Sequence, residues 1–169
     1  MNSLSLAVPW NISIEELNNY LRAAGVEAIA LDDAQLVRDL DAPTRARRIE
    51  SLRKSAARAR ADAPPVAQWL AASEAVVMQD DGSAEARARA DTFWLRLSQI
   101  VYGCLALVML GDLSEFPFFV ELLRHQPAGH LAELATDVLR HYVDPRGELD
   151  RARLVHQAEV WWREKPCEG

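Results

Sequence analysis

The chain has 169 residues, 50% of them hydrophobic and 26% charged, and a net charge of −6. This length and mix are typical of one globular domain, residues 1–169. The acidic balance argues against a general binder of nucleic acid or anionic membranes. The two cysteines form no zinc or redox motif, and the first residues lack the pattern of a signal peptide. We therefore expect a cytoplasmic protein with no metal and no cofactor.

Four helices are predicted in the first 80 residues, and their apolar stripes are irregular. Capping residues or helix breakers mark the four starts: Ser13 with Glu16, Asp32 or Asp33, Asp41 with Pro43, and Pro64-Pro65. Gly25 suits the end of the first helix, because glycine readily adopts the left-handed conformation there. The second helix is expected to be short and to end near Leu40, and the third to reach Ala61.

An uncharged run of eleven residues, IVYGCLALVML, occupies positions 100–110. It is shorter than the roughly 20 apolar residues that a membrane span requires. Because it is apolar on every side, it is typical of a helix surrounded by other helices. We expect it to complete a long helix over residues 84–110, followed by helices from about 114, over 131–142 and over 148–165. With no clear period-two segment, the predicted fold is all-α, with about seven or eight helices.

The segment VMLGDLSEFPFFVELLRHQPAGHLAELATDVLRHYVDP resembles a HEAT-like helical pair: an amphipathic helix, a short turn, an Ala- and Leu-rich helix, then Asp-Pro. The later AEVWWRE is similar to the C-terminal cap of small bacterial HEAT-like proteins, including immunity proteins of toxin–immunity pairs. The resemblance covers roughly residues 93–165. It implies that an irregular bundle, residues 1–80, passes into antiparallel helix pairs, residues 84–165, that present one face to a partner.

The predicted partner-binding residues lie on the last two helices. Glu133, Asp137, Arg140 and Asp144 recur at helical spacing, opposite Leu131 and Val138, and predict a largely acidic stripe that meets a basic surface. An ordinary solvated face would show the same pattern.

Trp161 is the fifth predicted partner-binding residue, because tryptophan is enriched at interface hot spots. Adjacent helical positions point about 100° apart, so we expect that Trp161 and Trp162 do not both face the same core. A tryptophan that caps the last helix of a small domain is the structural alternative.

The third helix is basic, with seven cations against Glu50 alone between Arg45 and Arg60. Such a stripe would contact phosphates, dock an acidic protein, or simply face solvent. It lacks the interleaved aromatic residues that stack on bases, so nucleic-acid binding is the less favoured reading.

No residue set predicts catalysis. His130 and His141 are about 16 Å apart along a helix, too far to share a metal. Cys104 lies in the apolar run, where its thiol is expected to be inert. We expect that the chain is not an enzyme.

The favoured function is that of a cytosolic immunity-type protein, which would bind a cognate toxin and block its active surface by steric and electrostatic occlusion. One alternative is a helical scaffold or adaptor that self-associates. Another is a HEAT-like nucleic-acid enzyme similar to the alkylpurine DNA glycosylase family, which would need a basic concave groove. Surface charge discriminates among them: an acidic face favours the inhibitor, a basic groove the enzyme, and a broad apolar patch the scaffold.

Overall fold

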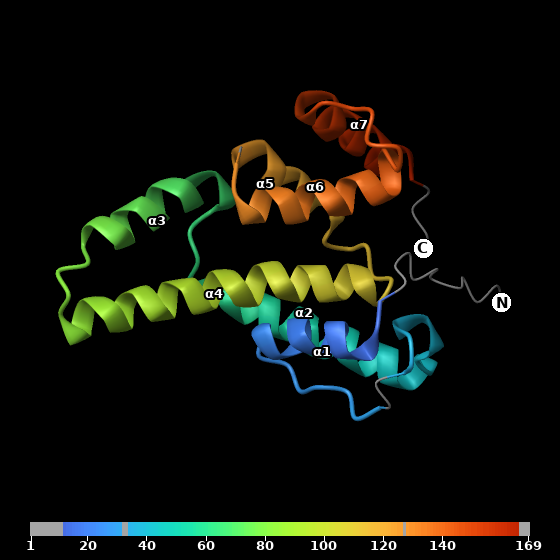
Figure 1. Cartoon of the computed structure of the whole chain (residues 1–169), viewed down its shortest axis with the longest axis horizontal. Coiled ribbons are helices and arrows are strands. Elements are labelled where there is room, and N and C mark those ends of the chain that lie inside the picture. Colours follow the sequence, from blue (N-terminus) through green and yellow to red (C-terminus); the bar gives the residue numbers. More distant parts are fainter. Residues whose placement is uncertain (1–11, 32–33, 127, 166–169) are drawn as a thin grey trace. The chain divides into compact units, whose positions relative to one another are not determined.

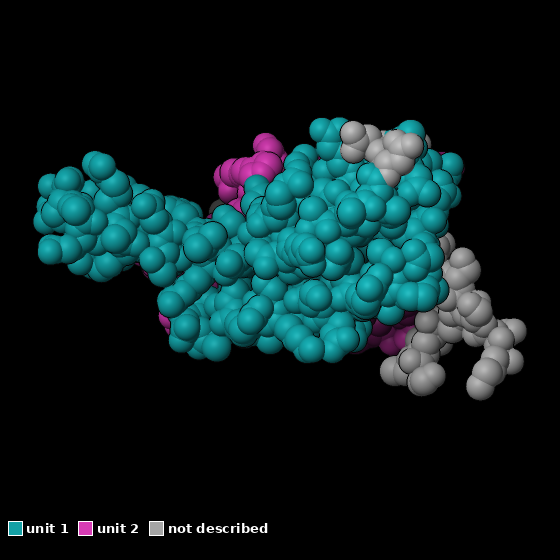
Figure 2. All heavy atoms as spheres, turned by 90° about the horizontal axis from the view of Figure 1, so that it is seen from below, with its two compact units in different colours: residues 1–64, 73–113 teal, residues 65–72, 114–169 magenta. Residues whose placement is uncertain are grey.

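The computed structural model describes residues 12–31, 34–126 and 128–165, and these residues contain seven α-helices and two 3₁₀ helices (Figure 1). The predicted all-α fold class is confirmed: within those ranges the only β-type pairing is an isolated bridge between Ser13 and Leu36. Contacts divide the chain into two compact units, coloured separately in Figure 2. Unit 1 comprises residues 1–64 and 73–113, and unit 2 comprises residues 65–72 and 114–169. That residues 1–169 form a single domain stays a prediction.

The first helix of unit 1, α1 (Ile14–Ala23), has the predicted ends. Glu16 N donates to Ser13 Oγ at 3.2 Å and Ser13 N donates to the Glu16 carboxylate at 3.0 Å, which completes the capping box. Gly25 follows the helix with a φ of 71°, as glycine at a helix end often does. The helix buries Ile14, Leu17 and Leu21.

The short second helix that was predicted to end near Leu40 is only a three-residue 3₁₀ helix, η1 (Val37–Asp39). Hydrogen bonds from Ile14 N to Gln35 O and from Val37 N to Ile12 O, 3.1 and 3.0 Å long, pair this segment with the chain before α1. The proposed caps Asp32 and Asp33 lie outside the described residues. The next helix, α2 (Ala42–Ala61), starts as predicted, because Thr44 N donates to Asp41 at 2.8 Å.

The centre of unit 1 is its longest helix, α4 (Ala84–Met109), which Ser83 caps by accepting a hydrogen bond from Ala86 N at 3.1 Å. Both α1 and α2 pack against it. Of residues 100–110 only Tyr102 is not buried, so the predicted core helix is confirmed. Ala24, directly after α1, packs near Gly103 of α4: a Cβ at Gly103 would lie 3.6 Å from the Ala24 Cβ, an ordinary van der Waals distance.

The whole of α4 is long and apolar enough to cross a membrane by length and composition, although the run at 100–110 is not. Of its most apolar 18-residue window, 56% is buried inside the protein. Core helices of soluble helical proteins pass the same test, and the burial of α4 is of that kind.

Unit 2 contains α5 (Phe116–His125), α6 (His130–Val143) and α7 (Arg151–Glu164), and each packs against the other two. The 3₁₀ helix η2 (Val66–Gln68) contacts α5, and the buried Trp69 ring lies 5.8 Å from that of Phe118. The predicted helix after Pro64-Pro65 is α3 (Trp69–Met78), which begins in unit 2 and continues into unit 1.

Candidate functional site

Two of the predicted partner-binding residues, Glu133 and Asp137, are exposed on α6, as expected. They are four residues apart and therefore share a helix face. Within the described ranges, neither carboxylate forms an ion pair. Partial burial lowers the pKa of His141, which keeps this nearby side chain neutral at pH 7. The exposed face of α6 therefore carries negative charge that His141 does not offset.

Asp144 does not belong to this exposed stripe, so its predicted place there is wrong: only 6% of the residue is exposed. Its carboxylate accepts hydrogen bonds from Glu148 N at 2.9 Å and Leu149 N at 3.0 Å, which shapes the turn after α6. These two residues therefore lie in the turn, and α7 begins later than predicted, with Asp150 as its cap. Arg140 lies beside Asp144, with its Nε 3.8 Å from Oδ2, but its side chain is 43% exposed, so a partner-binding role for Arg140 stays a prediction.

The pKa of Asp144 is lowered by this arrangement. Burial alone would raise it, but the backbone N–H groups of Leu149, Glu148 and Gly147, together with Arg140, favour the charged form and outweigh the burial. Asp144 is thus a charged turn-forming residue, and its carboxylate is buried and hydrogen-bonded inside the turn.

Trp161 and Trp162 both pack on one core ring, which contradicts our expectation that adjacent indoles would not. Their ring centroids lie 4.9 and 5.5 Å from that of the fully buried Phe116. Tryptophan side chains are long enough that two of them, about 100° apart on a helix, can both contact the Phe116 ring. Backbone direction alone therefore did not predict this packing. Tyr142 and Lys165 complete the cluster, the Lys165 Nζ lying 5.5 and 5.7 Å from the two indoles. A partner-binding role for Trp161 stays a prediction.

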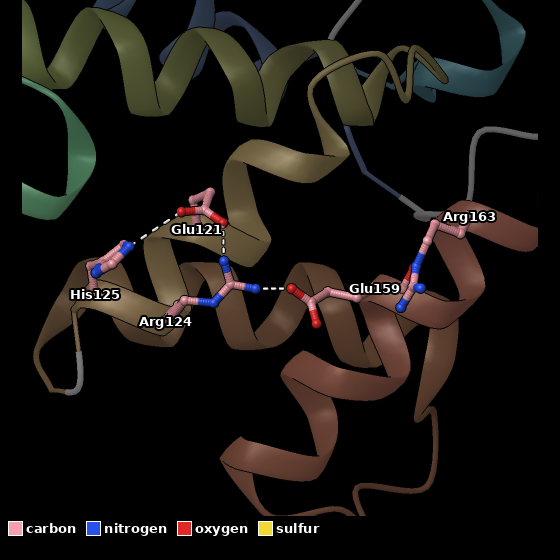
Figure 3. Close-up of polar contacts among 5 residues, drawn as sticks. All are labelled: Glu121, Arg124, His125, Glu159 and Arg163. Atoms are coloured by element: carbon pink, nitrogen blue, oxygen red, sulfur yellow. Dashed lines mark hydrogen bonds and ion pairs between the residues drawn. The ribbon is translucent and has the colours of Figure 1, made fainter.

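A surface groove of about 310 Å³ lies between α5 and α7 of unit 2. Three apolar residues and three charged residues line it: Pro117, Val120 and Trp162, and Glu121, Glu159 and Arg163. Figure 3 shows Arg124 of α5 between Glu121 of the same helix and Glu159 of α7, forming an ion pair with each. Glu121 also contacts His125, with Oε2 3.2 Å from Nε2. The groove therefore combines an apolar lining with carboxylates that are engaged in ion pairs.

The sequence contained part of the signal for this groove. Glu121, Arg124 and His125 have the i, i+3, i+4 spacing at which helical side chains meet. Glu159 is 35 residues from Arg124 along the chain and joins it only because α5 and α7 pack together. The tryptophan pair was recognised, but Trp162, not Trp161, is the one that lines the groove.

The arginines at the start of the basic helix α2 bind carbonyl groups of its own unit. Arg45 Nη2 donates to Val37 O and Arg38 O at 3.3 and 3.2 Å, and Arg48 Nη2 donates to Ala28 O at 3.0 Å. They hold the segment that connects α1 to α2.

Further along α2, Arg53 binds Asp112 through Nε at 2.9 Å and Nη2 at 2.7 Å, and Arg60 Nη2 lies 3.3 Å from the sulfur of the buried Cys104. Lys54 pairs with Glu50 at 2.7 Å. Most of the predicted cationic stripe is therefore engaged within unit 1, which counts against its use as a phosphate-binding surface.

In the part of the chain that the structure describes, no group of three or more histidine, cysteine, aspartate or glutamate residues could hold a metal ion. Comparisons with protein-family models, with curated proteins and with solved structures found no match to this chain. The HEAT-like resemblance of residues 93–165 therefore stays a prediction.

Proposed function

We propose that the chain is a protein-binding module of the immunity type, which uses unit 2 to cover the active surface of a basic toxin. The observation that carries the proposal is the groove between α5 and α7. Its apolar lining of Pro117, Val120 and Trp162 suits an apolar or aromatic side chain that protrudes from a partner. At about 310 Å³, it is at the lower end of the range for sites that enclose a small molecule.

The groove is organised before a partner arrives. Arg124 fixes the carboxylates of Glu121 and Glu159 by ion pairs, and Trp162 is stacked on Phe116 with 19° between the ring planes. A partner would therefore order few side chains on binding, and this reduces the entropic cost of association. Trp161 also contacts Phe116, with 4.9 Å between the ring centroids.

The exposed carboxylates of Glu133 and Asp137 supply the electrostatic part of the proposal. Charges at the rim of an interface steer encounter with an oppositely charged partner and add salt-dependent affinity. A basic toxin, such as one that binds a negatively charged substrate, fits this requirement. The proposed complex would form in the cytoplasm, and HEAT-like pairing of residues 84–165 is the architecture that the resemblance suggests for it.

Non-enzymatic function is part of the proposal. The groove's carboxylates are already engaged by Arg124, so they are poorly placed to transfer a proton. The internal bonds of Arg45, Arg48 and Arg53 make nucleic acid a less suitable partner.

The test is to isolate the partner with the purified full-length chain as bait and then to assay it. Capture alone is insufficient: the partner's toxic activity must fall when one equivalent of the chain is added. Changing both Glu133→Lys and Asp137→Lys should weaken binding about tenfold at low salt and less at high salt.

The matched control carries Glu27→Lys and Glu148→Lys, which change the net charge equally at exposed positions elsewhere on the chain. Arg163→Glu at the groove should strengthen binding of a basic partner at low salt, because it makes the groove more acidic, whereas Arg146→Glu, which is exposed and does not line the groove, should have a smaller effect. Equal losses for the test and control variants would refute the proposed surface. A captured protein whose activity is unchanged would refute the immunity function.

A further inference from the structure

Unit 1 carries an arm, residues 73–96, formed by the end of α3, the following turn and the start of α4, and it projects from the rest of the unit (Figure 2). Large apolar side chains are exposed at two places on it: Val77 and Met78 at the tip, 64% and 87% exposed, and Trp94 and Leu95 near the base. α3 has only ten residues, and of these only the first, Trp69, is buried. Helices this short are marginal in water without tertiary packing, so burial of the apolar tip would stabilise α3.

A second groove, of about 380 Å³, lies at the base of the arm, between the end of α2 and the first half of α4. Its apolar lining includes Ala63, Pro64, Phe93 and Leu97, and its cationic lining includes Arg89 and Arg96. Arg96 lies 3.5 Å from Asp62 in a solvent-accessible ion pair. This groove suits a flexible apolar side chain, such as methionine, that is accompanied by negative charge.

Charge is distributed unevenly along the arm. Residues 74–85 contain four acids, Glu74, Asp80, Asp81 and Glu85, and no base. Residues 86–96 contain three arginines, Arg87, Arg89 and Arg96, and one acid, Asp91. The tip is therefore acidic and the base predominantly basic.

We propose that two copies of this chain pair through their arms, side by side and in opposite directions, about a two-fold axis. Val77 and Met78 of one copy insert into the groove of the other, and the acidic half of each arm faces the basic half of its mate. Along α4, Glu85 and Leu95 are about 15 Å apart, at 1.5 Å per residue, so tip and base can overlap over that length.

A second copy is favoured over a foreign protein because every feature of the arm has its complement on the arm or at its base. The apolar tip matches the apolar groove, and the acidic half matches the basic half. In a two-fold interface each contact occurs twice, which is how identical chains pair in closed dimers. The proposal uses residues of unit 1 only and does not depend on the toxin-binding surface of unit 2.

The first experiment measures the mass of the purified full chain by sedimentation equilibrium over a concentration series. The wild type should show a monomer–dimer equilibrium that weakens as salt is raised. Met78→Lys should raise the dimer dissociation constant at least about tenfold. Leu31→Lys is the control, because Leu31, like Met78, is an exposed large apolar side chain of unit 1 but lies outside the arm. A wild type that is monomeric throughout, even if the arm binds another protein, or a dimer indifferent to Met78→Lys, would overturn the proposal.

The second experiment separates contacts between copies from contacts within one copy. One variant carries Glu74→Lys, Asp80→Lys and Glu85→Lys, and the other carries Arg87→Glu and Arg89→Glu; all five positions are exposed. Each variant alone should be predominantly monomeric, since its two arm halves have like charge. An equimolar mixture should form the heterodimer, because both contacts are then between opposite charges. Failure of the folded variants to pair on mixing, with helicity confirmed by circular dichroism, would overturn the antiparallel arrangement.

Discussion

Replacing Arg53 by alanine removes the ion pair that joins α2 to the chain immediately after α4. Nε and Nη2 of Arg53 both donate to Oδ2 of Asp112, at 2.9 and 2.7 Å. The Asp112 side chain is only 7% exposed, whereas that of Arg53 is 56% exposed. The substitution therefore leaves a buried carboxylate without its arginine, while the arginine itself has little burial to lose.

The expected cost follows from this asymmetry. Hydrogen bonds to charged groups contribute about 1.5–3 kcal/mol to stability, and water at the half-exposed arginine places this pair near the lower end. We expect Arg53→Ala to reduce the free energy of unfolding by about 2 kcal/mol. For a chain of this size the melting temperature should fall by roughly 4–8 °C. Urea unfolding followed by circular dichroism, and a thermal scan, measure the two quantities.

Arg58→Ala is the matched control on the same helix. Arg58 is exposed, and no described residue forms an ion pair with it. Its removal should change the free energy of unfolding by less than about 0.5 kcal/mol. If both variants behave like the wild type, the structural role that we assign to the basic helix is refuted, and its arginines regain their place as candidates for phosphate contact.

Two further predictions concern the cores of the two units. Leu105→Ala, at a buried position of α4, should destabilise the fold by about 2–5 kcal/mol in urea unfolding, and a smaller loss would mean that the site collapses around the cavity. Asp144→Asn tests the lowered pKa of Asp144: since the folded pKa lies below the ordinary value, the wild type is fully stabilised above that value and loses this stabilisation as pH falls through the folded pKa. The variant should therefore lose less stability than the wild type between neutral and acidic pH, and parallel pH profiles would contradict the assigned turn role.

Helix starts could be predicted from the sequence wherever a local signal marks them. Ser13 with Glu16 and Asp41 with Pro43 lie next to the backbone groups that they satisfy, so their effect depends on a few neighbouring residues. The buried helix at 100–110 could also be predicted, because a run that is apolar on every side is typical of a helix surrounded by other helices. The segment around Val37 was misread because its conformation depends on pairing with the chain near Ile12, more than 20 residues earlier.

The candidate site was less predictable, because helical spacing alone does not say which polar side chains are already satisfied. Asp144 continues the spacing of Glu133 and Asp137, yet the N–H groups after α6 bind it inside a turn. Trp161 and Trp162 point in different directions by helical geometry, yet both reach Phe116. The backbone of the following turn decides the first outcome and the reach of the side chains decides the second, and an angle on a helical wheel contains neither.

The internal ion pairs of α2 also decide which charges are relevant to partner binding. Arg53 and Asp112 are 59 residues apart in the sequence, so the basic stretch between Arg45 and Arg60 looked like a free cationic surface until its partners were known. A charge that is neutralised inside its own unit contributes little to the field that a partner encounters. The exposed carboxylates of Glu133 and Asp137 and the unevenly charged arm are therefore better guides to partners than the most basic helix in the chain. For the arm, we therefore expect a specific result. The variant with a charge-reversed acidic half and the variant with a charge-reversed basic half should each be monomeric alone and should pair with each other when they are mixed.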